Sequence, residues 1–207
     1  MNYKVMLKEV AATVLAGVSI ALGAFVYLKV GGVVGATMFS IGLLAVITFR
    51  FPLYTGRIKD CNNFIEAPLS LVKILALNAV GCGLISLMID SAEIVAKCQA
   101  IVELRSDAGF WTSVYTGAGC GFIITLAVVA WKRTPLPLLI GMPAFILSGL
   151  THSVADVFYY CVGHEAVDAA AMTAYCGTAI GNFVGGIIFK IGDLSHKLPL
   201  TSTDNER

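Results

Sequence analysis

The sequence predicts an all-α membrane protein with six transmembrane helices, arranged as two inverted three-helix repeats in which the second and fifth helices are broken. The first reason is composition, because 57% of the 207 residues are hydrophobic and only 13% are charged. An average soluble domain has about 25% charged residues, and a soluble fold of this length could not bury so much apolar surface. We therefore expect a single domain, residues 1–207, that lies almost entirely within the lipid bilayer.

Apolar segments long enough to cross a bilayer alternate along the chain with charged or Gly/Pro-rich breaks. They predict spans at about 9–29, 33–55, 68–90, 110–131, 135–161 and 170–191. The first span is interrupted by charge near its start and is followed by further spans, so we expect a retained helix and not a cleaved signal peptide.

Six spans leave both termini on one side of the membrane, and the distribution of Lys and Arg indicates which side. Nine lie on the side of the termini and three on the other: Lys4, Lys8, Arg57, Lys59, Lys132, Arg133, Lys190, Lys197 and Arg207 against Lys29, Lys97 and Arg105. Because positive charge is enriched in cytoplasmic loops, we expect both termini in the cytoplasm and a location in the inner or plasma membrane of a prokaryotic cell.

The second and fifth spans contain residues that interrupt a helix. Pro52 and Gly56 lie in the last part of the second span, close to the charged Arg50. The fifth span contains Pro143 and then the polar segment from Ser148 to Asp156. Broken helices at membrane depth are tolerated only where the freed backbone groups face protein or a water-filled cavity. Two breaks in corresponding positions therefore predict a central pathway.

Short motifs that recur at similar spacing indicate the two repeats. Asn78-Ala-Val-Gly81 matches Asn182-Phe-Val-Gly185, and Ala16-Gly17 matches Ala118-Gly119. The distance from Ala16 to Asn78 is 62 residues and that from Ala118 to Asn182 is 64. An odd number of spans in each half requires the halves, about 9–90 and 110–191, to be inverted relative to each other. We expect Gly81 and Gly185 to pack helices closely, and Asn78 and Asn182 to link helices by hydrogen bonds.

Four polar residues near the breaks are candidates for a transport pathway. His152 lies at mid-span, and Asp156 follows one helical turn later, so the two side chains are placed to meet. An ionisable group inside the membrane indicates function by default, although a purely structural hydrogen-bonding role is the alternative. Thr55 lies on the other break and offers a neutral hydroxyl. Arg105, just before the fourth span, is either an ordinary flanking charge or an attractor of anions.

Other classes of function lack support in the sequence. The cysteines are scattered singly and form no metal-ligand motif: Cys61, Cys82, Cys98, Cys120, Cys161 and Cys176. We interpret them as reduced, small hydrophobic residues and expect no metal or other cofactor. The net charge of +1 without basic runs argues against nucleic acid. Neither a nucleophile arrangement nor a phosphate-binding loop indicates an enzyme.

Several of these motifs together resemble those of the formate/nitrite transporters. The segment from Phe145 to Phe158 is similar to the family's fifth-span signature, and Pro52-Leu-Tyr-Thr55 to its second-span loop. The segment from Cys120 to Val128 is similar to a fourth-span motif, and Gly181-Asn-Phe-Val-Gly-Gly186 to the closing motif. The matches fall in order over roughly residues 10–190.

The resemblance implies a homopentamer of aquaporin-like protomers, each with its own pore for a small monovalent anion such as formate, nitrite or hydrosulfide. It places the family's central histidine at His152, its loop threonine at Thr55 and its vestibule lysine at Arg105. It also implies apolar constrictions at Phe39, Leu43, Leu53, Tyr54, Ile124 and Phe145.

The chain departs from the family pattern at Thr151, where the family has Glu, and at Asp156, where it has Asn. Gly121, Pro52 and Tyr54 replace the family's Asn, Glu and Phe. We expect a proton-linked pathway in which His152, assisted by Thr55, protonates an anion between two apolar narrows, because a neutral acid is desolvated far more cheaply than its anion. The alternatives are an aquaporin-like channel for small neutral solutes and a membrane scaffold without transport activity.

Overall fold

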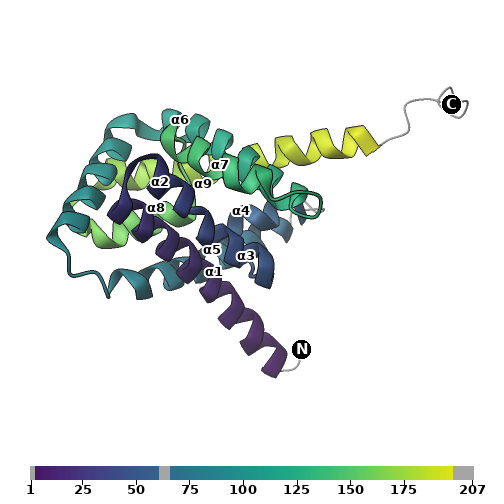
Figure 1. Cartoon of the computed structure of the whole chain (residues 1–207), viewed down its shortest axis with the longest axis horizontal. Coiled ribbons are helices and arrows are strands. Elements are labelled where there is room, and N and C mark those ends of the chain that lie inside the picture. Colours follow the sequence, from purple (N-terminus) through teal and green to yellow (C-terminus); the bar gives the residue numbers. More distant parts are fainter. Residues whose placement is uncertain (1–2, 61–65, 198–207) are drawn as a thin grey trace, which may run out of the picture.

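The computed structural model describes residues 3–60 and 66–197, and within them the chain is helical with no strand. The helices run in the order α1 (Tyr3–Val30), α2 (Gly32–Met38), α3 (Ser40–Phe49), α4 (Tyr54–Arg57), η1 (Ile58–Asp60), α5 (Glu66–Ser86), α6 (Ala92–Ala130), α7 (Leu136–Leu147), α8 (Ser153–Val162), η2 (His164–Ala166) and α9 (Ala169–Lys197). They form one bundle, and the last turns of α9 project beyond its body (Figure 1).

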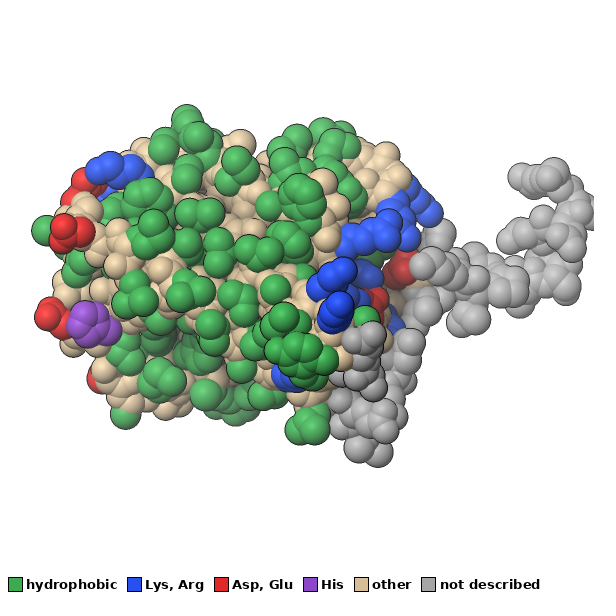
Figure 2. All heavy atoms as spheres, turned by 90° about the horizontal axis from the view of Figure 1, so that it is seen from below, with side chains coloured by type: hydrophobic (Ala, Val, Ile, Leu, Met, Phe, Trp, Pro, Cys, Tyr) green, Lys and Arg blue, Asp and Glu red, His purple; other side chains and the backbone are tan. Residues whose placement is uncertain are grey.

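Five segments of the described chain are long and apolar enough to cross a membrane: Tyr3–Val30, Gly32–Phe49, Leu69–Ser86, Ala92–Ala130 and Ala169–Asp193. The expected fifth span is instead made of two shorter apolar helices, α7 and α8. Hydrophobic side chains cover the middle of the face shown in Figure 2, and charged side chains gather at its two ends. This distribution fits a bundle surrounded by lipid.

The second expected span is broken where the sequence predicts it. Helix α3 ends at Phe49, and Arg50 adopts a left-handed conformation with φ 58°. The chain is then extended through Leu53 before the short helix α4 begins. Pro52 accounts for the break, because proline has no N–H to donate and disfavours the helical conformation of the residue before it. A further interruption, at Phe39 between α2 and α3, has no proline or glycine signal in the sequence.

The fifth expected span is broken as well. Helix α7 ends at Leu147, and Gly149 takes a positive φ of 71° that redirects the chain. Helix α8 starts again at Ser153, with His152 as its N-cap in an extended conformation. Pro143 lies inside α7 without ending it. The break is therefore set by Gly149 and by the polar residues after it.

The structure also alters two expected boundaries. The connection before the fourth span is not a loop, because α6 already begins at Ala92 and has a kink at Gly109, where φ is 71°. This kink allows the segment 92–108, which carries Arg105, to pack differently from the rest of α6. The third span is shorter than expected, since α5 ends at Ser86.

Two helix pairs pack with their backbones in close contact, α1 with α5 and α6 with α9. A Cβ added at Gly17 would overlap the backbone carbonyl of Asn78, and one at Gly121 would overlap that of Asn182. Gly81 and Gly185 face backbone atoms of α1 and α6 in the same manner. The contact of Gly17 with Asn78 is therefore matched by that of Gly121 with Asn182, whereas the paired motifs aligned Gly17 with Gly119. In both contacts 61 residues separate the glycine from the asparagine.

Candidate functional site

The two helix breaks meet inside the bundle. Thr55, at the start of α4, and His152, just before α8, lie with Thr55 Oγ1 and His152 Nε2 3.1 Å apart. Both side chains are almost fully buried, with exposed fractions of 0% and 2%. The structure therefore brings together the two polar residues that the sequence placed on separate breaks, 97 positions apart.

The hydrogen bonds of His152 define the state of its ring. Its Nδ1 accepts a hydrogen bond from the backbone N–H of Ala155 at 3.1 Å, which caps the first turn of α8. Because a backbone N–H only donates, Nδ1 must carry a lone pair, and the proton of the neutral imidazole sits on Nε2. Nε2–H then donates to Thr55 Oγ1, which leaves the Thr55 hydroxyl hydrogen free to donate to another oxygen.

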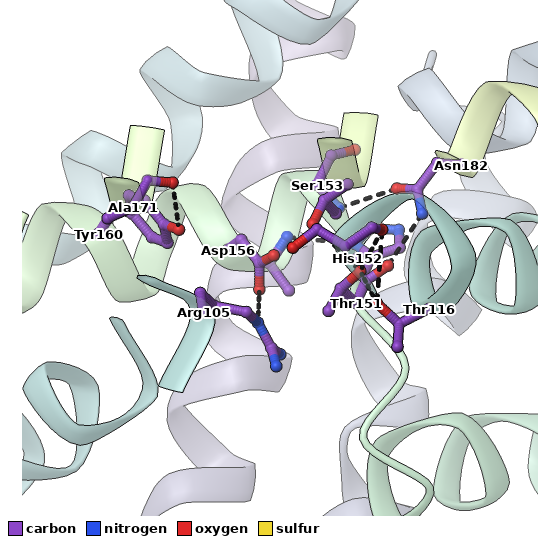
Figure 3. Close-up of polar contacts among 12 residues, drawn as sticks. Arg105, Thr116, Thr151, His152, Ser153, Asp156, Tyr160, Ala171 and Asn182 are labelled. Carbon is purple, nitrogen blue, oxygen red and sulfur yellow. Dashed lines mark hydrogen bonds and ion pairs between the residues drawn. The ribbon is translucent and has the colours of Figure 1, made fainter. Parts of the chain in front are cut away.

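Two buried asparagines hold the breaks in place, and Figure 3 shows the one at the second break, Asn182. Asn182 Oδ1 accepts from Ser153 N at 2.9 Å, and its Nδ2 donates to Thr151 O and to the carbonyl of Gly117, both at 2.9 Å. The backbone groups on either side of His152 are thereby fixed to α9 and α6. The imidazole owes its position to this link between helices.

Asn78 makes the equivalent bonds at the other break. Its Oδ1 accepts from Tyr54 N at 3.0 Å, and its Nδ2 donates to Pro52 O at 3.0 Å and to Thr13 O at 2.8 Å. Leu53, between the two bonded residues, thus occupies the position that His152 occupies in the second half. One break presents an apolar side chain at this point and the other a hydrogen-bonding ring.

A cavity of about 550 Å³ opens on one side of this contact. Leu53 lines it, and so do four basic side chains, Arg50, Arg57, Lys59 and Lys132. Arg57 and Lys59 both contact the carboxylate of Asp60. We call this space the basic cavity. Its excess of positive charge suits the approach of an anion. Arg50, for which the sequence indicated no partner or role, is one of the residues that line this cavity.

A second, smaller cavity of about 130 Å³ is lined by His152 itself. Phe39 and Phe145 form an edge-to-face pair in its wall with ring centroids 5.8 Å apart, and the ring of Phe145 lies 6.2 Å from that of His152. We call this space the histidine cavity. The Thr55–His152 contact therefore adjoins both cavities: Leu53 and Gly56, which lie close to Thr55 in the sequence, line the basic cavity, and His152 lines the histidine cavity together with two phenylalanines.

Asp156 does not pair with His152. Its carboxylate Oδ1 lies 3.5 Å from Nε of Arg105 (Figure 3), and both residues line the histidine cavity. The negative charge near the imidazole is therefore compensated by a guanidinium that comes from the segment of α6 before its kink. Arg105 is accordingly more than a flanking surface charge.

Four of the expected pathway residues line neither of these two cavities: Leu43, Tyr54, Ile124 and Thr151. The hydroxyl of Tyr54 donates to the carbonyl of Ala179 at 2.9 Å, which directs it to α9. The hydroxyl of Thr151 lies 3.1 Å from those of both Thr116 and Thr178. Thr151 thus joins a buried hydroxyl cluster, although Leu43 and Ile124 remain fully buried apolar residues close to the breaks.

Sequence reasoning missed several residues around the site. Tyr27 and Tyr159 line the histidine cavity, and Trp131 lines the basic cavity. Each is a single aromatic residue in an apolar segment of the sequence, which is equally typical of lipid-facing or core positions. The described residues contain no group of His, Cys, Asp and Glu suited to a metal ion.

A family model for formate/nitrite transporters matches residues 3–192. The chain belongs to the formate/nitrite transporter family. A solved structure described as a pentameric formate channel with formate bound is similar, with a TM-score of 0.77 and 17% identity, over 95% of this chain and 98% of the other. Another, described as an FNT family ion channel, has a TM-score of 0.79 and 20% identity, over 92% and 90%. No curated protein matches the sequence.

Membership of the formate/nitrite transporter family places the chain among membrane transport proteins. The match covers both breaks and both cavities, so the site lies inside the part of the chain that defines the family. The structural likeness shows the shared all-helical fold. What this member does with Asp156 and Arg105 must be derived from its own residues.

Proposed function

We propose that this protein is a channel or transporter for small monovalent anions or their weak acids, such as formate, nitrite or hydrosulfide, and that its central histidine links transport to protons. The observation that carries the proposal is the buried Thr55–His152 contact that adjoins both cavities. It is the point at which a solute crossing from the basic cavity to the histidine cavity would meet hydrogen-bonding groups.

The geometry supports a defined role for each group. With Nδ1 held by the cap, His152 donates Nε2–H to Thr55 Oγ1, and Thr55 in turn offers its hydroxyl hydrogen to the solute. A hydroxyl donor that is itself hydrogen-bonded to an imidazole suits an oxygen or sulfur atom with lone pairs. The apolar neighbours Leu53, Phe39 and Phe145 penalise a bare charge much more than a neutral molecule, so protonation of the solute at this point lowers the barrier to crossing.

A proton relay through His152 requires both nitrogens. A proton taken up at Nδ1 breaks the bond to Ala155 and places a positive charge at the N-terminus of α8, where the helix dipole opposes it. The imidazolium is therefore short-lived: it passes the Nε2 proton to Thr55 Oγ1, whose own hydroxyl proton goes to the solute. The neutral ring then carries its proton on Nδ1 and must turn over to restore the bond from Ala155 N. Arg50 and the other basic residues of the basic cavity raise the local concentration of anions on that side.

We further propose that the two halves of the chain are inverted repeats and that the protein is a homopentamer in a prokaryotic inner or plasma membrane with both termini in the cytoplasm. The matched bonds of Asn78 and Asn182 and the matched contacts of Gly17 and Gly121 support the repeat. The similar structure described as pentameric supports the assembly. Cross-linking in native membranes and the mass of the detergent-solubilised protein test it.

Two variants of His152 in proteoliposomes test the proton linkage. His152→Ala removes both the cap and the Nε2 donor, whereas His152→Asn keeps a capping oxygen for Ala155 and removes the titratable ring nitrogen Nε2 beside Thr55. Uptake of formate, nitrite, hydrosulfide, acetate and lactate is measured over a pH series. We expect both variants to lose roughly tenfold or more of the proton-dependent flux, and equal flux in wild type and variants at every pH would exclude the relay.

A channel for small neutral solutes is the second candidate, and the Arg105–Asp156 pair favours it, because the pair leaves that part of the histidine cavity without net charge. Water, urea and ammonia are the solutes to test in the same liposomes. Uptake that is independent of pH, in the absence of any anion flux, would select this function over the proposed one.

A further inference from the structure

The carboxylate of Asp156 is buried without adequate hydrogen bonds. Its side chain is 1% exposed, and neither oxygen has a hydrogen-bond partner among the described residues. Nε of Arg105 is likewise buried and unpartnered, since its 3.5 Å separation from Asp156 Oδ1 exceeds the roughly 2.7–2.9 Å of a charge-assisted hydrogen bond. Buried polar groups in folded proteins are nearly always satisfied, so the arrangement indicates that another molecule completes it.

The pair faces a space that accepts such a molecule. Asp156 and Arg105 both line the histidine cavity of about 130 Å³. The terminal nitrogens of Arg105 point away from Asp156 (Figure 3), and the Arg105 side chain keeps 13% of its surface exposed. The cavity thus offers a hydrogen-bond acceptor of full negative charge and, next to it, a fork of donors with full positive charge.

A ligand that satisfies both groups must donate a hydrogen bond and accept one. A bare carboxylate or nitrite satisfies Arg105 but brings its charge against the buried carboxylate of Asp156, which is costly in an apolar surrounding. A protonated carboxylic acid satisfies both, because its O–H donates to Asp156 in a short O–H···O⁻ bond and its carbonyl accepts from Arg105. The acid arrives with its own proton, so binding requires no proton transfer.

We propose that the Arg105–Asp156 pair is a binding station for small carboxylic acids in their protonated form, one helical turn from His152. This inference rests on the proposed transport function and specifies which form of the solute occupies the histidine cavity. The pair selects the neutral acid over the anion, while His152 and Thr55 act at the crossing point beyond it.

The other titratable groups around the pair are His152 and Tyr159 of α8, Tyr27 of α1, Cys98 and Cys120 of α6, Tyr160 of α8 and Tyr175 of α9. Tyr and Cys side chains ordinarily do not carry charge in the range of about pH 5 to 7, where the test is made. Asp156 and Arg105 thus set the charge of the cavity together with His152.

The test uses proteoliposomes that contain the full-length protein, labelled formate outside, a pH-sensitive dye inside and a potassium diffusion potential. For wild type we expect each formate taken up to carry one proton, with no effect of an inside-positive potential. An anion pathway would instead respond strongly, because 100 mV changes the equilibrium accumulation of a monovalent anion about 50-fold. Formate uptake by wild type that follows the potential and carries no proton would overturn the inference and the proton linkage, while the proposed transport of small anions would stand.

Asp156→Asn tests the role of the carboxylate. The variant keeps the shape of the side chain and leaves Arg105 with an uncompensated charge, so we expect uptake that follows the potential. Asp107→Asn is the matched control, since it removes an exposed carboxylate from the same segment of α6, and it should behave as wild type. Electroneutral uptake with unchanged apparent affinity in Asp156→Asn would overturn the inference.

A double variant keeps the inference testable if Asp156→Asn alone fails to fold. Arg105→Gln with Asp156→Asn removes both charges and retains a donor and an acceptor. We expect uptake to remain electroneutral with an apparent affinity roughly tenfold weaker, because charge-assisted hydrogen bonds are replaced by neutral ones. An unchanged affinity would refute the binding station, and the absence of flux for every solute in wild type would refute the proposed function itself.

Discussion

Replacement of Asn182 by alanine should destabilise the protein through the backbone groups that it leaves unpaired. Asn182 is fully buried, and its three hydrogen bonds are all 2.9 Å long. Ser153 is the first residue of α8, so its N–H has no partner within the helix. The carbonyl of Thr151 lies in the extended segment before α8, whereas that of Gly117 is in mid-helix and keeps the usual backbone partner.

Two orphaned backbone groups therefore decide the magnitude. At about 1–3 kcal/mol each, they give a loss of about 2–6 kcal/mol in the free energy of unfolding. In membranes the unfolded state also finds hydrogen-bond partners, so we expect about 2–3 kcal/mol. The loss should be accompanied by faster hydrogen exchange at Ser153, because its amide loses the hydrogen bond to Asn182 Oδ1.

The assay is denaturant unfolding in detergent micelles, combined with hydrogen-exchange mass spectrometry of the peptide that contains Ser153. Thr173→Ala is the control on the same helix, because its hydroxyl donates to the carbonyl of Ala169 at an exposed site, and its effect should stay within about 0.5 kcal/mol. A loss below about 1 kcal/mol for Asn182→Ala, or unchanged exchange at Ser153, would show that the asparagine does not hold the break.

Two further predictions concern packing and pH. Gly121→Ala should cost about 2–3 kcal/mol, because the added Cβ overlaps the backbone carbonyl of Asn182. Gly83→Ala should be neutral or gain up to about 1 kcal/mol, since nothing lies within 4 Å of its added Cβ; equal unfolding midpoints for the two variants would contradict this packing. The backbone N–H of Ala171 and the hydroxyl of Ser106 lower the pKa of Asp168, at the start of α9. A carboxylate with a lowered pKa stabilises the fold above its unfolded value of about 3.9 and loses this contribution as the pH falls through the folded value. Asp168→Asn should therefore differ from wild type in thermal unfolding at pH 6 and converge with it under acid conditions, and a constant difference at all pH values would refute the assignment.

The prediction from sequence was most accurate where local chemistry acts directly. The low charge content required a membrane protein, and Pro52 interrupts a helix wherever it is placed, so the first break follows from the residue itself. His152 stood out as a potential site because a polar ring at membrane depth needs partners. The asparagine motifs predicted links between helices. The sequence motifs aligned Gly17 with Gly119, however, whereas the matching contact in the structure is made by Gly121, two residues further on.

Contacts between distant segments had no local signal. The segment 92–108 before Gly109 mixes apolar residues with five charged ones. Because this pattern is equally typical of a loop between two spans, the kinked start of α6 was missed. The family pattern placed Tyr54 and Thr151 in the pathway, yet their hydroxyls bond to Ala179 and to a threonine cluster. Those partners come from α6 and α9, whose distance from the breaks depends on the packing of the whole bundle.

The sequence by itself determined that the chain is an apolar helical bundle with two interrupted helices and that His152 and Thr55 are its conspicuous polar residues. It did so because composition, proline and buried ionisable groups have energetic consequences in any fold. Only the tertiary structure decided which residue neutralises Asp156. The neighbouring His152 is one turn away on the chain, but its two ring nitrogens already bond to Ala155 and Thr55. The partner is instead Arg105, which the kink in α6 brings to the histidine cavity.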